Sequence, residues 1–225
     1  MCRGGEKVAD KVERKSLVDQ VYNLILKKIQ TRELVPGDRL NIEELAKAFD
    51  VSRTPVRETI NRLIQEGFVE QKHNVGPSIV KLDEEQETDL IEANAYLFNI
   101  VIDTYHQLGR LDSLAADLEE VIEDQSRAYE TRDDNSFHEA SVQFHKIMID
   151  YCTNHTIREC AKKTQNQINM CTFAYLATTE NRKLSIQAHT EIKDALKSGE
   201  IEKAKALMEE HNKFSEIGYM KKKGS

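Results

Sequence analysis

The fold of the first part of this chain is decided at Phe49–Leu63, where the sequence reads FDVSRTPVRETINRL. Val56, Ile60 and Leu63 recur at helical spacing, which predicts a helix with an apolar underside. Its first turn holds hydroxyl residues that can cap a helix and a proline that a first turn tolerates. A short helix of this kind suits the major groove of DNA, although a solvated surface helix can show the same pattern. The side chains expected on its outer face are Ser52, Arg53, Thr54 and Arg57.

Two patterns before this helix complete a helix-turn-helix. An apolar stripe over 17–29 predicts an amphipathic helix that ends near Thr31. Pro36 and Gly37 then mark a turn, and a second, short helix is expected over 42–49. Because only a tight corner at Asp50 separates this helix from the next, the two should form a helix-turn-helix.

A short β-hairpin is expected after the third helix. Gly67 is suited to end that helix. Residues 68–72 alternate, the pattern breaks at 73–77 and it resumes at 78–82, which predicts two strands joined by a turn. Three helices followed by a hairpin form a winged helix. Its tip would reach the DNA backbone or minor groove, or form an ordinary solvated turn, and His73 and Gly76 are the candidate contacts there.

Charge divides the chain into two parts. The 225 residues are 39% hydrophobic and 32% charged, as is typical of a globular chain rich in surface helix. Residues 1–82 carry 15 Lys and Arg against 12 Asp and Glu, whereas residues 83–225 carry 17 against 27, and the net charge is −7. We therefore expect a mildly basic domain at residues 10–82 and an acidic domain at residues 83–225. Whole-chain acidity does not exclude DNA binding, because only the surface near the phosphates matters.

The sequence predicts a cytoplasmic protein without a membrane partner. No apolar run approaches the ~20 residues that a membrane span needs, and the first residues lack the apolar core of a signal peptide. The cysteines show no C-x-x-C spacing, so they are expected to be unbridged thiols and not zinc ligands. These cysteines are Cys2, Cys152, Cys160 and Cys171.

Residues 83–225 predict a bundle of α-helices. No proline follows Pro77, and apolar stripes recur at helical spacing. The expected fold is therefore mainly α, with an N-terminal winged helix-turn-helix that includes a small β-hairpin, and a C-terminal all-α antiparallel helical bundle. The helices of the bundle are expected at about 84–109, 111–130, 134–152, 155–177, 180–198 and 200–217.

Three histidines of the expected bundle could meet in its interior. His145, His189 and His211 lie on apolar stripes of three different helices. Three neutral imidazoles that converge would suit a divalent ion, with zinc and nickel the best candidates. Taken singly, each is more often a core histidine satisfied by hydrogen bonds. Spacing alone leaves both interpretations open.

Four motifs follow one another in the first part of the chain: LxPGxRL at 34–40, ELA at 44–46, VSRTPVRE at 51–58 and RLxxxG at 62–67. On these motifs, residues 15–82 resemble the DNA-binding domain of the GntR family of bacterial transcription regulators. In this family the start of the third helix enters the major groove, which implies that Arg53 and Arg57 are the main contacts. Ser52 and Thr54 would contact phosphate or base edges, and Arg39 the DNA backbone. Some relatives carry a basic residue where this chain has an acidic one at position 43.

Two further motifs lie in the second part, FH at 144–145 and HxxIxxALxxGExxxAxxxMxxH at 189–211. On these motifs, the second part resembles the ligand-binding FCD domain of the FadR-type branch of this family. Many members hold a divalent metal with three histidines and one aspartate, which lies one helical turn before the first histidine. In this chain the aspartate position is Ser141, and neither His138 nor Glu139 replaces it.

The missing aspartate leaves three possibilities for the pocket. The three histidines keep the metal, with water or an effector carboxylate completing its shell, or they bind it weakly, or the effector binds without metal. We favour the first. Two residues of the polar segment 165–169 would either line the pocket or belong to a solvated face. A pocket with few cationic side chains favours a small, singly charged or neutral effector. The residues that the resemblance places near it are Asn94, Ser141 and Asn154.

The expected protein is a homodimeric transcription regulator that responds to a small metabolite, such as an organic acid. Its two winged helices would bind a pseudo-palindromic double-stranded DNA operator. A regulator that senses the metal itself is one alternative. A three-histidine metalloenzyme is another, but it lacks a carboxylate one turn from any of the three histidines that could act as a general base.

Overall fold

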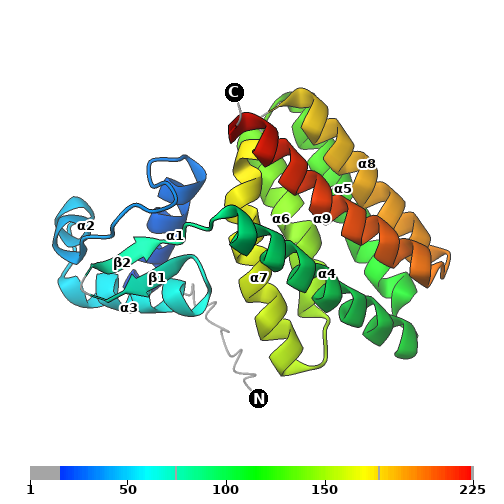
Figure 1. Cartoon of the computed structure of the whole chain (residues 1–225), viewed down its shortest axis with the longest axis horizontal. Coiled ribbons are helices and arrows are strands. Elements are labelled where there is room, and N and C mark those ends of the chain that lie inside the picture. Colours follow the sequence, from blue (N-terminus) through cyan, green and yellow to red (C-terminus); the bar gives the residue numbers. More distant parts are fainter. Residues whose placement is uncertain (1–15, 74, 177, 224–225) are drawn as a thin grey trace, which may run out of the picture.

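The computed structural model of this chain has a small head beside a larger helical bundle (Figure 1). It describes residues 16–73, 75–176 and 178–223, with the side chains of all these except 171–175 and 214–223. The head consists of α1 (Leu17–Gln30), α2 (Ile42–Ala48), α3 (Arg53–Gln65), β1 (Val69–Lys72) and β2 (Gly76–Ile79). The bundle consists of α4 (Glu84–Gln107), α5 (Leu111–Thr131), α6 (Asp134–Asp150), α7 (His155–Tyr175), α8 (Thr179–Lys197) and α9 (Ile201–Lys223). This architecture confirms the expected fold class.

The apolar underside of α3 is buried, as its spacing predicts. Val56, Ile60 and Leu63 are at most 2% exposed and share one core with Val21 and Ile25 of α1. Burying side chains of this size contributes roughly 1.5–3 kcal/mol each to stability. This packing places the polar side of α3 on the surface of the head.

The corner between α2 and α3 is tight. Asp50 takes a left-handed conformation with a φ of 52°, which turns the chain sharply before α3. Ser52 occupies the N-cap position, but its side chain makes no capping hydrogen bond. The hydroxyl of Ser52 is therefore not used to close the helix, and the residue is exposed.

The hairpin differs from the prediction in its second strand. That strand was expected at 78–82, whereas β2 begins at Gly76, paired with Lys72, and ends at Ile79. Gly76 has a φ of 96°, a backbone conformation that glycine adopts easily and other residues rarely adopt. Because glycine permits this turn, the second strand begins two residues earlier than the apolar pattern indicates. The backbone of Ile79 also hydrogen-bonds the loop before α2.

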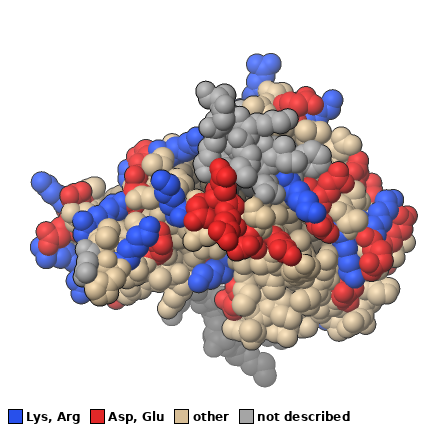
Figure 2. Space-filling model, in the orientation of Figure 1, with Lys and Arg blue, Asp and Glu red and all other residues tan. Residues whose placement is uncertain are grey.

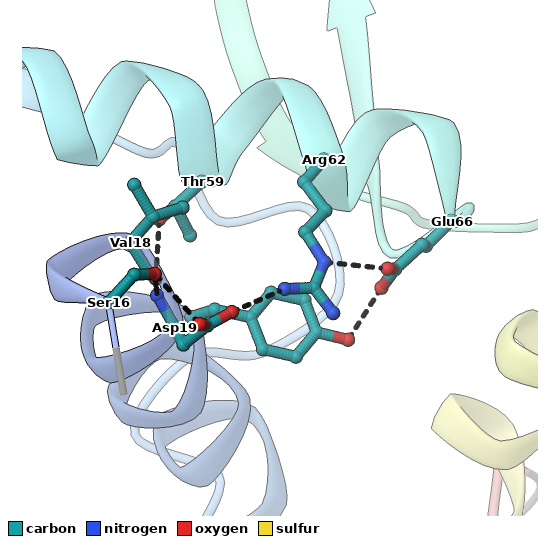
Figure 3. A network of polar contacts seen from close by, with 7 residues as sticks. Ser16, Val18, Asp19, Thr59, Arg62 and Glu66 are labelled. Carbon is teal, nitrogen blue, oxygen red and sulfur yellow. Dashed lines mark hydrogen bonds and ion pairs between the residues drawn. The ribbon is translucent and has the colours of Figure 1, made fainter. Parts of the chain in front are cut away.

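A polar network fastens α1 to α3 (Figure 3). The Arg62 guanidinium lies 3.9 Å from the centre of the Tyr22 ring and donates to Asp19 at 3.1 Å and to Glu66 at 2.9 Å. The Tyr22 hydroxyl donates to the other carboxylate oxygen of Glu66 at 2.5 Å. Burial and this hydrogen bond raise the pKa of Tyr22, so its hydroxyl remains a donor. The network fixes the angle between the two helices.

The bundle has one continuous core. Phe98, Tyr105, Leu118, Phe144 and Met208 are among its fully buried side chains, and they come from α4, α5, α6 and α9. Helix ends fall within two residues of the expected positions, except in α9, which continues to residue 223. No helix in the described ranges is long and apolar enough to cross a membrane.

Two cysteines can be placed. Cys152 is buried, Cys160 is exposed, and both are free thiols, as expected. Cys2 and the side chain of Cys171 lie outside the described residues.

Replacing Arg62 by alanine should lower the free energy of unfolding by about 1–2 kcal/mol, because one cation–π contact and two half-exposed ion pairs are lost. Arg57→Ala is the matched control, since it removes the same side chain from an exposed position of the same helix. Urea unfolding followed by circular dichroism measures both. Equal destabilisation of the two variants would contradict the role of the network.

Candidate DNA-binding face and histidine cavity

The expected DNA contacts of α3 lie together at the exposed start of the helix. Ser52, Arg53, Thr54 and Arg57 are all exposed, while the residues on the other side of the same turns are buried. Figure 2 shows Lys and Arg gathered on the head in this view, whereas Asp and Glu are more numerous over the bundle. The four side chains at the start of α3 are therefore already accessible on the surface of the head.

Glu43 forms an ion pair with Arg53, one of the two arginines expected to contact DNA. Its Oε1 atom lies 2.9 Å from Nη1 of Arg53, and the two side chains are 67% and 65% exposed. Such an exposed pair contributes little to stability. It matters for DNA binding because a carboxylate beside the guanidinium repels nearby phosphates. Arg57 has no ion-pair partner in the described part of the chain.

Arg39 and Gly76 meet at the wing. The backbone of Arg39 forms a β-bridge to Ser78, and its Nη2 atom lies 3.7 Å from the position that a Cβ at Gly76 would take. The guanidinium therefore lies along the wing. His73 is exposed near the tip, and Asn74 lies outside the described residues.

The three expected metal ligands converge inside the bundle. Nε2 of His211 lies 3.2 Å from Nε2 of His189 and 3.2 Å from Nε2 of His145. One ligand atom of each histidine lies within 4.8 Å of the other two. The His189 ring stacks on Phe144 with 3.9 Å between ring centres. Because α6, α8 and α9 each supply one histidine, the packing of the bundle itself builds the cluster.

Hydrogen bonds determine which nitrogen of His189 faces the cluster. Gln125 donates from Nε2 to the Ser185 hydroxyl at 3.2 Å, so its Oε1 accepts from Nδ1 of His189 at 2.8 Å. Nδ1 therefore carries the proton, and Nε2 directs its lone pair toward the other histidines. Metal-binding histidines usually have such a partner on the second nitrogen. Gln125 comes from α5, so the spacing of the histidines could not have identified it.

Burial keeps the three imidazoles neutral. It lowers the pKa of His211 to about 4. It lowers the pKa of His145 and of His189 well below the usual value, and charge repulsion between the histidines adds to this effect. The neutral imidazole is the form that binds metals.

A polar cavity adjoins the cluster. The volume open to the centre of a water molecule is about 20 Å³, which is enough for roughly one water. Among the side chains that the structure describes, the lining includes no Lys, Arg, Asp or Glu. From the polar segment 165–169, Gln165 and Asn169 line the cavity, so two of its residues face inward as one of the two interpretations expects. The other polar or imidazole residues of the lining are His138, Ser141, His145, Ser185, His211 and Asn212.

The structure separates the expected pocket residues. Ser141 is 8% exposed and lines the cavity one turn before His145. Asn94 is fully buried behind the wall, where it donates to Oε1 of Gln165 at 3.1 Å. Asn154 does not line this cavity: it is exposed, and its Oδ1 accepts from the backbone N–H of Ile157 at 3.2 Å. An asparagine before a helix is a preferred cap, and this local role explains its position.

Two further buried side chains, His138 and Asn212, lie at the cavity. His138 lies two turns from His145, yet it lines the same cavity, without joining the cluster of ligand atoms. Asn212 is 2% exposed, and its Nδ2 lacks a hydrogen-bond partner among the described residues, as does Nδ1 of His145. A buried polar group without a partner is unfavourable by about 1–3 kcal/mol. A molecule bound here would therefore gain hydrogen bonds.

Two family models match separate parts of the chain. The family described as bacterial regulatory proteins, gntR family, matches residues 17–79. The FCD domain matches residues 110–214. The first match covers nearly all of the head, and the second extends from the start of α5 into α9.

Curated relatives and solved structures agree with these matches. The chain is 24% identical to the uncharacterized HTH-type transcriptional regulator YdhC of Bacillus subtilis, over 83% of each chain. It is 28% identical to the Nta operon transcriptional regulator of Aminobacter aminovorans, over 72% of this chain and 74% of the relative. The structure of E. coli McbR/YncC matches with a TM-score of 0.74 at 20% identity, over 92% of this chain and 99% of that one, which supports the fold alone.

Arg53→Ala and Arg57→Ala should each weaken binding to a DNA fragment selected by the wild-type protein by about tenfold or more, since each removes one base or phosphate contact. Fluorescence anisotropy at several salt concentrations measures the affinity and its salt dependence. Arg127→Ala, an exposed arginine of the bundle, is the control. Unchanged affinity in both α3 variants would exclude α3 as the reading helix.

Acid should destabilise the metal-free protein. The pKa values of His138 and His211 are lowered to about 4 from the ordinary 6.5, so the unfolded chain binds more protons between these two values. The free energy of unfolding should be highest above pH 6.5 and fall with decreasing pH by up to about 1.4 kcal/mol per pH unit for each such histidine. Urea unfolding in chelator at about pH 7.5, 6 and 5 tests this. His138→Gln should flatten the dependence, and His106→Gln, at an exposed position, should not.

Proposed function

Because this chain belongs to the GntR family of bacterial transcription regulators and carries an FCD domain, we propose that its DNA binding responds to a small molecule held at the histidine cavity. The family and the named relatives are transcription regulators, so the chain is not an enzyme and the metalloenzyme alternative is rejected. The observation that carries the proposal is the convergence of three neutral histidines beside a polar cavity.

The histidine cluster fits a divalent ion. Ligand nitrogens around a tetrahedral zinc ion, at bonds of about 2.0–2.1 Å, lie about 3.3–3.4 Å apart. The two separations of 3.2 Å between Nε2 atoms are close to this value. His145, His189 and His211 would therefore hold zinc or nickel. When bound, the ion would supply a positive charge that attracts an anionic ligand.

The character of the effector follows from the charges around the cavity. Ser141, at the position of the expected aspartate, is neutral, and no cationic side chain is found among the described residues of the lining. The charge of an organic acid would therefore be balanced by the ion alone, which favours a small acid over a polyanion. The buried Nδ2 of Asn212 could donate to a second oxygen of such a ligand.

A regulator of metal supply is the second candidate function. The observation that favours it is the small size of the cavity, about 20 Å³, which accommodates an ion and about one water but no metabolite without rearrangement. DNA affinity measured with and without metal, at constant metabolite concentration, separates the two functions. A response to metal alone would identify the ion as the signal.

We further propose that the protein acts as a homodimer. One head can read only one half-site, and two identical heads related by a two-fold axis would match a pseudo-palindromic operator. In this arrangement residues 10–82 form the DNA-binding domain and residues 83–225 the domain that binds the effector and the second subunit.

Metal analysis should find close to one divalent ion per chain in the purified protein. His211→Ala should reduce nickel affinity in calorimetry by at least about tenfold, because one of three ligands is lost. His106→Ala is the control, since this histidine is exposed at the end of α4. If no metal is found and chelator leaves stability unchanged, the three histidines are core residues and any effector binds without metal.

A further inference from the structure

Helix α7 contacts the cavity and the head at the same time. Successive residues of a helix are rotated by about 100°, so Gln165 and Asn169 share one face, and Asn166 and Met170 share the neighbouring face. The first pair lines the cavity, whereas the second pair contacts the head. In Figure 1, α7 lies on the side of the bundle that faces the head.

The contacts with the head are close and specific. Asn166 donates from Nδ2 to the backbone carbonyl of Glu66, just after α3, at 3.0 Å. Met170 is 9% exposed and belongs to the core of the head. Gly67 has a φ of 86°, and a Cβ there would lie 2.8 Å from Cγ of Lys163. Because Glu66 also closes the polar network between α1 and α3, a shift of α7 acts directly on the reading helix.

The contacts with the cavity are a chain of buried amides. Gln165 donates from Nε2 to Oδ1 of Asn169 at 2.8 Å, and its Oε1 accepts from Asn94 at 3.1 Å. Gln165 and Asn169 are 4% and 8% exposed. Since the cavity holds roughly one water, a larger ligand must displace part of its wall. Amide groups can exchange their mutual hydrogen bonds for bonds to the ligand, so this wall is the part best suited to move.

We propose that α7 couples the two sites. A ligand that enters the cavity displaces Gln165 and Asn169, and the resulting shift of α7 changes how Asn166 and Met170 hold the end of α3. The use of this coupling by an effector rests on the proposed function, but the coupling itself belongs to the free protein. It is also reciprocal, so a head repositioned on DNA changes the affinity of the cavity for its ligand.

Hydrogen exchange of the full-length protein tests the coupling without a ligand. The readout is a ratio: the exchange rate of amides 64–69 divided by that of amides in α5. The rate in α5 reports general destabilisation, so the ratio reports local opening at the end of α3. Asn166→Ala should raise this ratio at least fivefold, because it removes a direct contact. Gln165→Ala and Asn169→Ala should each raise it at least twofold, although neither residue faces the head.

Cys160→Ser is the matched control, because Cys160 is an exposed residue of the same helix. It should leave the ratio unchanged. The proposal is overturned if Asn166→Ala has no effect, since the contact with the head would then be unimportant. It is also overturned if Asn166→Ala raises the ratio and both cavity variants leave it unchanged, since α7 would then hold the head without coupling it to the cavity.

A second arm separates this proposal from the proposed function. Nickel with acetate, a probe larger than one water, is added to the wild-type protein, and calorimetry measures binding in the same samples. Binding should change the exchange of amides 64–69, and Asn166→Ala should reduce that change. Binding without any change contradicts the coupling. Absence of binding contradicts the metal-dependent function, and the variants above then decide the coupling alone.

Discussion

The burial of one side of α3 is the constraint on which the head depends. Val56, Ile60 and Leu63 lie on one face of α3 and are buried. Because they share that face, the opposite face of the same turns must point outward. The arginines therefore owe their position to the apolar residues beneath them. The polar network around Arg62 then fixes α3 relative to α1. Apolar packing and the ion pairs of Arg62 together determine the position of the exposed face of α3.

Electrical neutrality is the corresponding constraint in the bundle. With serine at position 141, the described residues of the histidine cluster and of the cavity beside it include no charged side chain. Buried charge is unfavourable unless it is paired, so a divalent ion here would require an anion from outside the protein. In the proposed function, serine at this position would leave completion of the metal shell to the ligand, and ion and effector would then bind in a single event.

Much of the fold could be predicted from the sequence because apolar periodicity reports helices directly. The underside of α3, most helix ends and the meeting of three histidines follow from spacing and from resemblance. The start of β2 could not be predicted, since the positive φ of Gly76 leaves no trace in the apolar pattern. Asn154 was placed near the pocket, but the local demand for a helix cap determines its position.

Contacts between distant segments were the other gap. Gln125 and Asn212 approach the histidines only through helix packing, and no spacing rule connects residue 125 with residue 189. Asn166 was recognised as part of a polar segment, but its partner lies 100 residues earlier in the chain. Periodicity predicts which face of a helix is buried. Only the tertiary structure shows which residues pack against that face.

The position of Met170 has a consequence for modularity. This bundle side chain fills part of the hydrophobic core of the head, so the two halves are not self-contained building blocks. A gene fusion that joined this head to a foreign sensor would leave a hole lined by apolar side chains where the methionine had been, and holes of that kind are destabilising. A fusion of this head to another bundle would therefore need a side chain of similar volume at the position of Met170.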